Sequence, residues 1–179
     1  MTKEELAKKI YEISHLTGEF KLRSGKVSNE YFDKYLFESN PKILREIANQ
    51  LANKIPENTE ILAGLETGGI PIATALSLKT NLPAIFVRKK AKEYGTCKLA
   101  EGVKFENKQV CIIEDVVTTG GQVIESVKKL RKKGANIDTV LCVILRDELA
   151  LDLLKEESLT LIPLFTMNCL KNRKEKEDI

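Results

Sequence analysis

The stretch from Val110 to Val123, VCIIEDVVTTGGQV, constrains the fold of this chain more than any other. It begins with apolar and β-branched residues, passes through two adjacent acids, and ends in hydroxyls and two glycines where a helical period starts. This order predicts a buried strand, a polar loop and the N-terminus of a helix. Repeated units of that kind are typical of α/β folds with a mainly parallel sheet.

The same stretch has the chemistry of a site for a phosphorylated sugar. Gly120 and Gly121 carry no side chain that would keep an anion from the backbone, and the following helix offers unpaired N–H groups and the positive end of its dipole. Glu114 and Asp115 offer acceptor oxygens, which suit two neighbouring sugar hydroxyls or a hydrated magnesium ion. The alternative is an ordinary strand-to-helix turn that happens to be rich in Gly and Thr.

Composition narrows the classes of function. With 179 residues, 42% of them hydrophobic, the chain is long enough for one well-buried core. The 29 basic and 26 acidic residues leave a net charge of +3, so a nucleic-acid partner is not implied. The four cysteines form no C-x-x-C pair, which argues against zinc and favours a reducing cytoplasm. No apolar run approaches the roughly 20 residues that span a bilayer, and no apolar signal region is seen, so no membrane partner is expected.

Other polar segments follow other predicted elements. We expect a helix over 2–17, a hairpin-like segment over 18–37 and a helix from Pro41 to Ile55. Strands at 61–63, 84–87 and 139–145 lead into the loop GLETGG, a basic run that starts at Arg88, and Arg146, respectively. Because the carboxyl ends of parallel strands meet at one edge of a sheet, these groups should share one binding edge. The only histidine, His15, ends the first helix, where a structural role is favoured over a catalytic one.

Several of these motifs resemble those of known enzymes. The segment IIEDVVTTGG is similar to the signature of the type I phosphoribosyltransferases, and F-x-L-x-S-G-x-x-S, from Phe20 to Ser28, resembles the orotate phosphoribosyltransferases. The basic run resembles their pattern R-K-x-x-K-x-H-G, with departures at Tyr94, where histidine is common, and at Cys97. Arg146 has the family's spacing from the acids, but Leu145 stands where aspartate is common, and Asp147 follows instead.

The resemblance implies an α/β fold with an open, mainly parallel sheet flanked by helices and an N-terminal hood over the carboxyl edge of that sheet. It implies a single domain over 1–179, with the first helix and the hood in 1–37, a mobile catalytic loop at 88–102 and a frayed tail at 171–179. The activity implied is transfer of a 5-phosphoribosyl group from 5-phosphoribosyl 1-diphosphate (PRPP) to orotate. Mg²⁺ is expected on the substrate diphosphate and water, near Glu114 and Asp115, in a cytoplasmic homodimer with a shared active site.

The resemblance also assigns roles to residues. Orotate would meet Tyr31, Phe32, Thr118 and Arg146, and catalysis would depend on Arg88, Lys89 and Lys92. The residues implied for binding PRPP are Arg23, Thr67, Gly68, Arg88, Lys89, Lys92, Tyr94, Glu114, Asp115, Val116, Val117, Thr118, Thr119, Gly120, Gly121 and Gln122.

Simpler interpretations stay open for three of these features: core packing for Tyr31 and Phe32, a plain turn for GLETGG and a solvated charged face for the basic run. Two other functions also stay open. One is transfer to another base, such as a purine, which Arg146 and the segment from Phe20 to Ser28 disfavour. The other is a regulator that senses the ribosyl diphosphate without catalysis, which could afford to lose the basic loop that this chain keeps.

Overall fold

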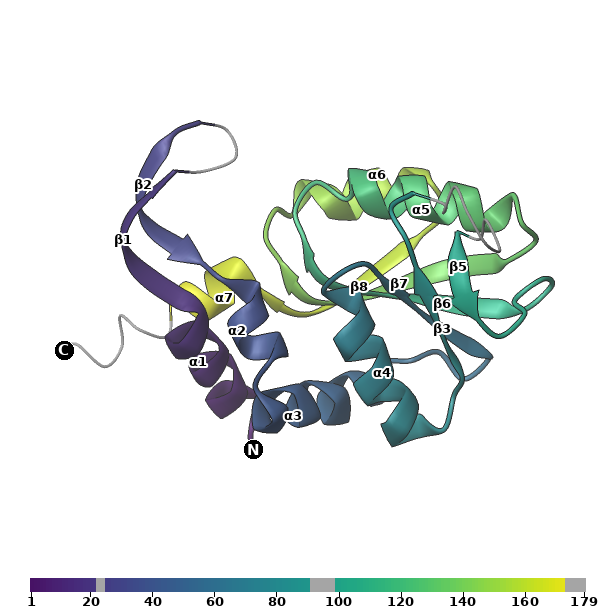
Figure 1. The fold of residues 1–179 in the computed structure, drawn as a ribbon, viewed down its shortest axis with the longest axis horizontal. Coiled ribbons are helices and arrows are strands. Elements are labelled where there is room, and N and C mark those ends of the chain that lie inside the picture. The colour runs from purple at the N-terminus through teal and green to yellow at the C-terminus, as the bar shows by residue number, and fades with distance from the viewer. Residues whose placement is uncertain (22–24, 91–98, 173–179) are drawn as a thin grey trace.

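The computed structural model describes residues 1–21, 25–90 and 99–172. The expected loop at 88–102 is therefore described only at its two ends, and most of the expected tail lies outside the described residues. In chain order the elements are α1 (Lys3–Ser14), β1 (His15–Lys21), β2 (Val27–Phe32), α2 (Lys34–Glu38), α3 (Pro41–Ala52), β3 (Ile61–Leu65), α4 (Gly69–Thr80), β4 (Ala84–Val87), β5 (Ala100–Gly102), β6 (Gln109–Val117), α5 (Gly121–Arg131), β7 (Asn136–Leu145), α6 (Leu149–Glu156), β8 (Thr160–Thr166) and α7 (Met167–Lys171) (Figure 1).

The central sheet has the order β5-β4-β3-β6-β7-β8. All its neighbouring strands pair in parallel except β4 and β5, which are antiparallel at one edge. The predicted mainly parallel sheet is therefore confirmed. The strand β6 is longer than the apolar run suggested, because it continues through both acids to Val117, which pairs with Leu145 of β7.

Helices cover both faces of this sheet. Alternate residues of β6 divide between two clusters, with Ile112 in one and Cys111 and Ile113 in the other, as the two-residue period of a strand requires. The Ile112 cluster includes buried residues of α5 and α6, and the Ile113 cluster includes residues of α1, α2, α3, α4 and α7. Asp115 continues the row of Ile113, so it faces the side covered by α2 and α4.

The first helix ends earlier than its sequence pattern predicts. The capping box of Thr2 and Glu5 is present as expected, but α1 stops at Ser14 and β1 begins at His15. The reason is pairing with β2, in which His15 opposes Phe32 and Leu16 opposes Tyr31. The expected hairpin is therefore confirmed, although it begins three residues sooner than the sequence indicated.

The β1–β2 hairpin is a separate two-stranded sheet that projects from the end of the molecule where α1, α2 and α7 lie (Figure 1). Its strand β2 runs back into α2, whose first turn is capped when the Asp33 side chain accepts a hydrogen bond from the Tyr35 N–H (3.0 Å). The hairpin and α2 thus bring polar residues to the carboxyl edge of the central sheet. Within the described ranges, no helix has the length and apolarity that a membrane crossing requires.

Candidate functional site

The carboxyl ends of β3, β4 and β6 surround a cavity of about 310 Å³, which we call the cradle hollow. The start of α2 and the N-terminus of α5 complete its wall. Its lining residues are Lys34, Tyr35, Glu66, Thr67, Lys89, Glu114, Asp115, Val116, Val117, Thr118, Thr119, Gly120, Gly121, Gln122 and Val123. The predicted sugar-phosphate loop, both adjacent acids, Thr67 and Lys89 are therefore brought together in one place.

The N-terminus of α5 forms one end of this hollow. Gly120 has a φ of 80°, in the left-handed region that favours glycine, and a Cβ there would overlap the buried side chain of Leu154. No side chain caps α5, so the first N–H groups of the helix are available to an anion. In contrast to Gly120, Gly121 has open space where a Cβ would lie. This end of the hollow has the geometry of a phosphate site at a helix N-terminus.

Both acids of the loop are buried, with exposed fractions of 7% for Glu114 and 0% for Asp115. The Lys34 ammonium lies 2.5 Å from Asp115 Oδ2, and Glu114 Oε1 accepts a hydrogen bond from the Asp115 N–H at 3.0 Å. Glu38 of α2 is also buried, and its carboxyl lies beside that of Asp115. Glu114, Asp115 and Lys34 therefore line the hollow, and the Glu38 carboxyl lies behind them against Asp115.

The three carboxyls of this group differ in the direction of their pKa shifts. Burial tends to raise the pKa of Asp115, but hydrogen bonds with Glu114, Glu38 and Lys34 outweigh burial, and its pKa is lowered. Burial, together with the hydrogen bond and the charge of Asp115, raises the pKa of Glu38 to about 9 and the pKa of Glu114 well above its usual range. At neutral pH the negative charge is therefore concentrated on Asp115.

The turn after β3 forms another wall. The Glu66 carboxylate accepts a hydrogen bond from the Lys89 N–H at 2.8 Å, which ties this turn to the segment after β4. A Cβ on Gly68 would overlap the Asp115 carboxyl, and one on Gly69 would overlap the Ile113 carbonyl. Two glycines are thus required for α4 to approach β6 closely. Thr67 is exposed to the hollow, while Gly68 lies beneath it against Asp115.

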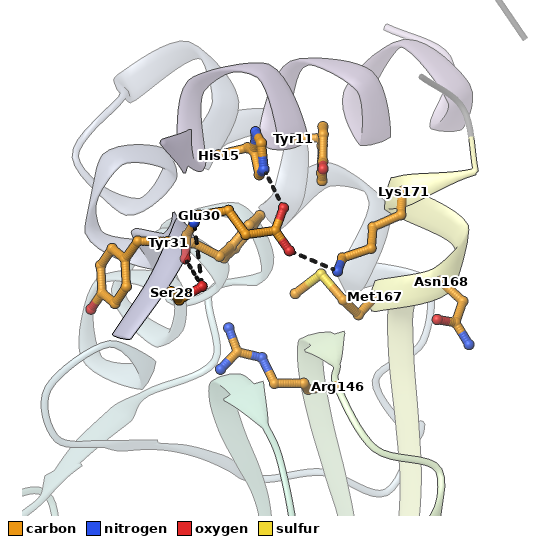
Figure 2. Close-up of a pocket in the computed structure, with 10 residues that line it drawn as sticks. Tyr11, His15, Ser28, Glu30, Tyr31, Arg146, Met167, Asn168 and Lys171 are labelled. Carbon is orange, nitrogen blue, oxygen red and sulfur yellow. Dashed lines mark hydrogen bonds and ion pairs between the residues drawn. The ribbon is translucent and has the colours of Figure 1, made fainter. Parts of the chain in front are cut away.

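A second cavity, of about 380 Å³, lies beneath the β1–β2 hairpin, and we call it the hairpin hollow (Figure 2). Arg146 extends into it from the end of β7, and no described residue pairs with its guanidinium (Figure 2). The Arg146 N–H donates to the carbonyl of Val117 at 2.8 Å, so the two hollows adjoin at the ends of β6 and β7. The lining residues are Tyr11, His15, Ser28, Glu30, Tyr31, Phe32, Arg146, Met167, Asn168 and Lys171.

In the hairpin hollow, Glu30 of β2 contacts residues of β1 and α7. Its carboxylate contacts His15 Nε2 at 2.9 Å and Lys171 Nζ at 3.5 Å, and His15 stacks on Tyr11 with ring centroids 4.8 Å apart (Figure 2). The hydrogen bond from His15 and then the charge of Lys171 lower the pKa of Glu30. These contacts tie the hairpin to α1 and α7, and His15 takes part in them.

The structure separates some residues that the sequence grouped. Tyr31, Phe32 and Arg146 share the hairpin hollow, but Thr118 lines the cradle hollow. Arg88 lines neither of the two, and its Nε lies 3.8 Å from the Glu101 carboxylate of β5. Three further residues, Arg23, Lys92 and Tyr94, lie outside the described residues, as does Cys97.

Among the described residues, the partner of the Asp147 carboxylate is Leu149 and not Arg146. That carboxylate accepts a hydrogen bond from the Leu149 N–H at 3.0 Å, at the start of α6, while Leu145 is buried at the end of β7. Sequence reasoning missed four residues that line the cradle hollow: Lys34, Tyr35, Glu66 and Val123. A buried acid such as Asp115 requires a counter-charge, but the sequence does not indicate which of the 29 basic residues supplies it.

Comparison with known proteins adds independent findings. The phosphoribosyl transferase domain family matches residues 37–160. The chain is 48% identical over 161 residues to an orotate phosphoribosyltransferase of Nocardioides sp., covering 90% of each chain, and 43% identical to one of Methanocaldococcus jannaschii, covering 87% of this chain and 88% of that one. A crystal structure of the Mycobacterium tuberculosis orotate phosphoribosyltransferase superposes with a TM-score of 0.82 at 25% identity, covering 94% of this chain and 98% of the other.

Proposed function

The chain belongs to the phosphoribosyl transferase domain family and, within it, to the orotate phosphoribosyltransferases. From this premise we propose that it transfers the 5-phosphoribosyl group of PRPP to orotate, which gives orotidine 5′-phosphate and diphosphate in the synthesis of UMP. The observation that carries the proposal is the guanidinium of Arg146, which pairs with none of the described residues and lies in a hollow that adjoins a phosphate cradle and two buried acids.

The cradle hollow suits the ribosyl diphosphate. In this proposal the N–H groups at the start of α5 bind the 5′-phosphate, and Asp115 and Glu114 accept or share hydrogen bonds with the ribose hydroxyls. Binding the phosphate at a fixed point positions the reacting carbon, so that binding energy far from the reaction supports the chemical step. Thr67 and Lys89, on the opposite wall, would then face the diphosphate.

The reaction explains why cations are needed at that wall. When the bond from ribose C1 to the diphosphate breaks, the sugar gains oxocarbenium character and the leaving group gathers negative charge. We assign stabilisation of that charge to Lys89, and we retain Arg88 and Lys92 in the same role as an expectation from the sequence. No covalent attachment to the enzyme is required, because N1 of orotate attacks the ribose carbon.

Mg²⁺ belongs to this proposal as an ion carried by the substrate. Among the described residues, no group of three or more His, Cys, Asp or Glu side chains could hold a metal. In the proposal this ion is bound by diphosphate oxygens and water, with the acids Glu114 and Asp115 nearby. Such an ion would neutralise charge on the departing diphosphate.

The hairpin hollow suits a flat ring that carries a carboxylate. A guanidinium offers two parallel N–H donors to a carboxylate, and that of Arg146 extends into this hollow. We place the ring beside Tyr31 and Phe32, with Thr118 at the boundary between the two hollows. A homodimer with a shared site and a cytoplasmic location are also proposed. Free thiols at Cys111, Cys142 and Cys169 accord with a reducing compartment.

The experiment compares two bases that differ by one carboxylate. Wild-type protein with PRPP and Mg²⁺ should consume orotate, measured as loss of its absorbance, and should use uracil poorly. Arg146→Ala should lower kcat/KM for orotate by about 10- to 100-fold, because a hydrogen bond between charged groups is worth about 1.5–3 kcal/mol, and should leave the rate with uracil nearly unchanged. Arg146→Lys serves as the control that keeps the charge but loses the paired donors.

Each alternative function gives a different result. Turnover of adenine or hypoxanthine in preference to orotate would indicate a purine enzyme. Binding of PRPP by calorimetry without turnover of any base would indicate a regulator. If Arg146→Ala loses activity equally with orotate and uracil, Arg146 does not act by binding the orotate carboxylate.

A further inference from the structure

Asp115, one of the two acids at the floor of the cradle hollow, is held by a residue from a distant part of the chain. Lys34, the first residue of α2, lies 2.5 Å from Asp115 Oδ2. The Asp115 side chain is only 1% exposed, whereas the Lys34 side chain is 34% exposed and lines the hollow. The ammonium therefore covers the carboxylate and also faces the space that a ligand would fill.

The fold fixes Lys34 in this place. Asp33 caps α2 by accepting from the Tyr35 N–H, so Lys34 occupies the first helical position, and Phe37 of the same short helix is fully buried. The strand before α2 ends at Phe32, in the hairpin hollow. Lys34 is thus positioned by backbone geometry and core packing, which limit the motion of its Cα and Cβ atoms.

The other titratable groups around Asp115 are the carboxyls of Glu38 and Glu114. Glu38 lies one helical turn after Lys34, and both Glu38 Oε1 and Asp115 Oδ2 lie against Gly68. Glu114 precedes Asp115 on β6 and bonds its N–H. Without Lys34, Asp115 would lose the ammonium that contacts it, and burial disfavours a carboxylate whose charge is not compensated.

The directions of the pKa shifts agree with this arrangement. Burial acts to lower the pKa of Lys34, but the hydrogen bond and charge of Asp115, with the charges of Glu114 and Glu38, outweigh burial and raise it. Lys34 is therefore cationic throughout the neutral range. Its ammonium has three donors, so it can keep one bond to Asp115 and offer another to a ligand oxygen.

We propose that Lys34 is a binding and positioning residue for PRPP: it keeps the Asp115 carboxylate charged and oriented for the ribose hydroxyls, and it adds a second cation beside Lys89 on the wall of the cradle hollow. The inference rests on the proposed function only in its choice of sugar substrate. It assigns a role in PRPP binding to α2, a helix outside the sugar-phosphate loop, and links that role to one ion pair.

The test measures binding of PRPP by calorimetry in the absence of orotate, so it does not require turnover. Lys34→Met keeps most of the side-chain length and removes the charge, and it should weaken PRPP binding about 10- to 100-fold, the range for losing a hydrogen bond to a charged group. Lys34→Arg should recover much of the affinity. Lys42→Met, which changes an exposed lysine on the adjacent α3, is the matched control and should bind as wild type.

Two further readouts distinguish this role from a general loss of structure. In steady-state assays, Lys34→Met should raise KM for PRPP while KM for orotate stays within about 2-fold. PRPP binding by Lys34→Met should also strengthen as the pH rises, because Asp115 then needs a higher pH to ionise, whereas wild-type binding should be flat over the same range.

A double-mutant cycle keeps the proposal testable if Lys34→Met folds poorly. In an Asp115→Asn background, where the carboxylate is absent, Lys34→Met should cost much less PRPP affinity than it does in wild type. The proposal is overturned if Lys34→Met and Lys42→Met bind PRPP equally well, or if the loss in Lys34→Met is the same with and without the Asp115 carboxylate. Failure of the orotate assay with intact PRPP binding would refute the proposed function alone.

Discussion

A methyl group added at Gly120 should destabilise the protein for two reasons that can be measured separately. The backbone of Gly120 is left-handed, with a φ of 80°, which costs a residue with a Cβ about 1–2 kcal/mol. The new Cβ would also overlap a δ-carbon of Leu154, a fully buried side chain, and overpacking of this kind costs about 1–3 kcal/mol. Gly120→Ala should therefore lower the free energy of unfolding by about 2–5 kcal/mol.

Leu154→Val shortens the overlapped side chain and so separates the cost of overpacking from the cost of the left-handed backbone. On its own it should cost about 0.5–1.5 kcal/mol, as for other single-methylene losses in a core. In that background Gly120→Ala should cost only the backbone term, about 1–2 kcal/mol. The free energy of unfolding of all four proteins, from urea denaturation at 25 °C, gives the coupling directly.

Gly121→Ala is the matched control for the adjacent position. Its φ is not positive, and the nearest atom to a new Cβ is the Thr119 hydroxyl at 4.0 Å. Since alanine is favoured over glycine inside a helix by up to about 1 kcal/mol, stability should be unchanged or higher, while phosphate affinity should fall because the methyl faces the cradle hollow. The reasoning is refuted if Gly120→Ala is as stable as Gly121→Ala, or if its cost is equal with and without the Leu154 change.

Three other predictions concern charge. Wild-type stability relative to Glu38→Gln should decline as the pH rises from about 4.5 to about 9, because the folded state retains the Glu38 proton that the unfolded chain releases; denaturation at several pH values tests this, and a constant difference would contradict it. Lys92→Ala should reduce turnover by about 100-fold or more if Lys92 stabilises departing charge, and a near-normal rate would assign it to a solvated face. Glu66→Gln should weaken the tie to the Lys89 N–H and raise KM for PRPP more than KM for orotate, while equal changes would count against that role.

The parts of the site that follow strands in sequence order were predictable from the sequence. The apolar run before Glu114, the double glycine and the helical period after it specify a strand, a turn and a helix by local physics alone. The helix start at Asn40 and Pro41 was predictable from the sequence for the same reason, and the structure confirms it. Each of these signals lies within a few neighbouring residues.

The parts that depend on contacts between distant segments were not predictable. His15 continues a helical pattern, yet it begins a strand because β2 pairs with it. The helices α2 and α7 have five residues each, too few for a periodic pattern, and β5 has three. The pairing of Lys34 with Asp115 follows from the tertiary fold, as does the hydrogen bond that the Asp147 carboxylate accepts from the Leu149 N–H.

Phe32 and Lys34 are separated by one residue, yet they face different hollows. The short segment from the end of β2 to the start of α2 therefore contributes one residue to each of the two cavities. If a molecule in one pocket displaces this segment, the residue that lines the other pocket moves with it. Thermodynamic reciprocity then requires that the factor by which the sugar donor changes affinity for the acceptor ring equals the factor by which the ring changes affinity for the donor.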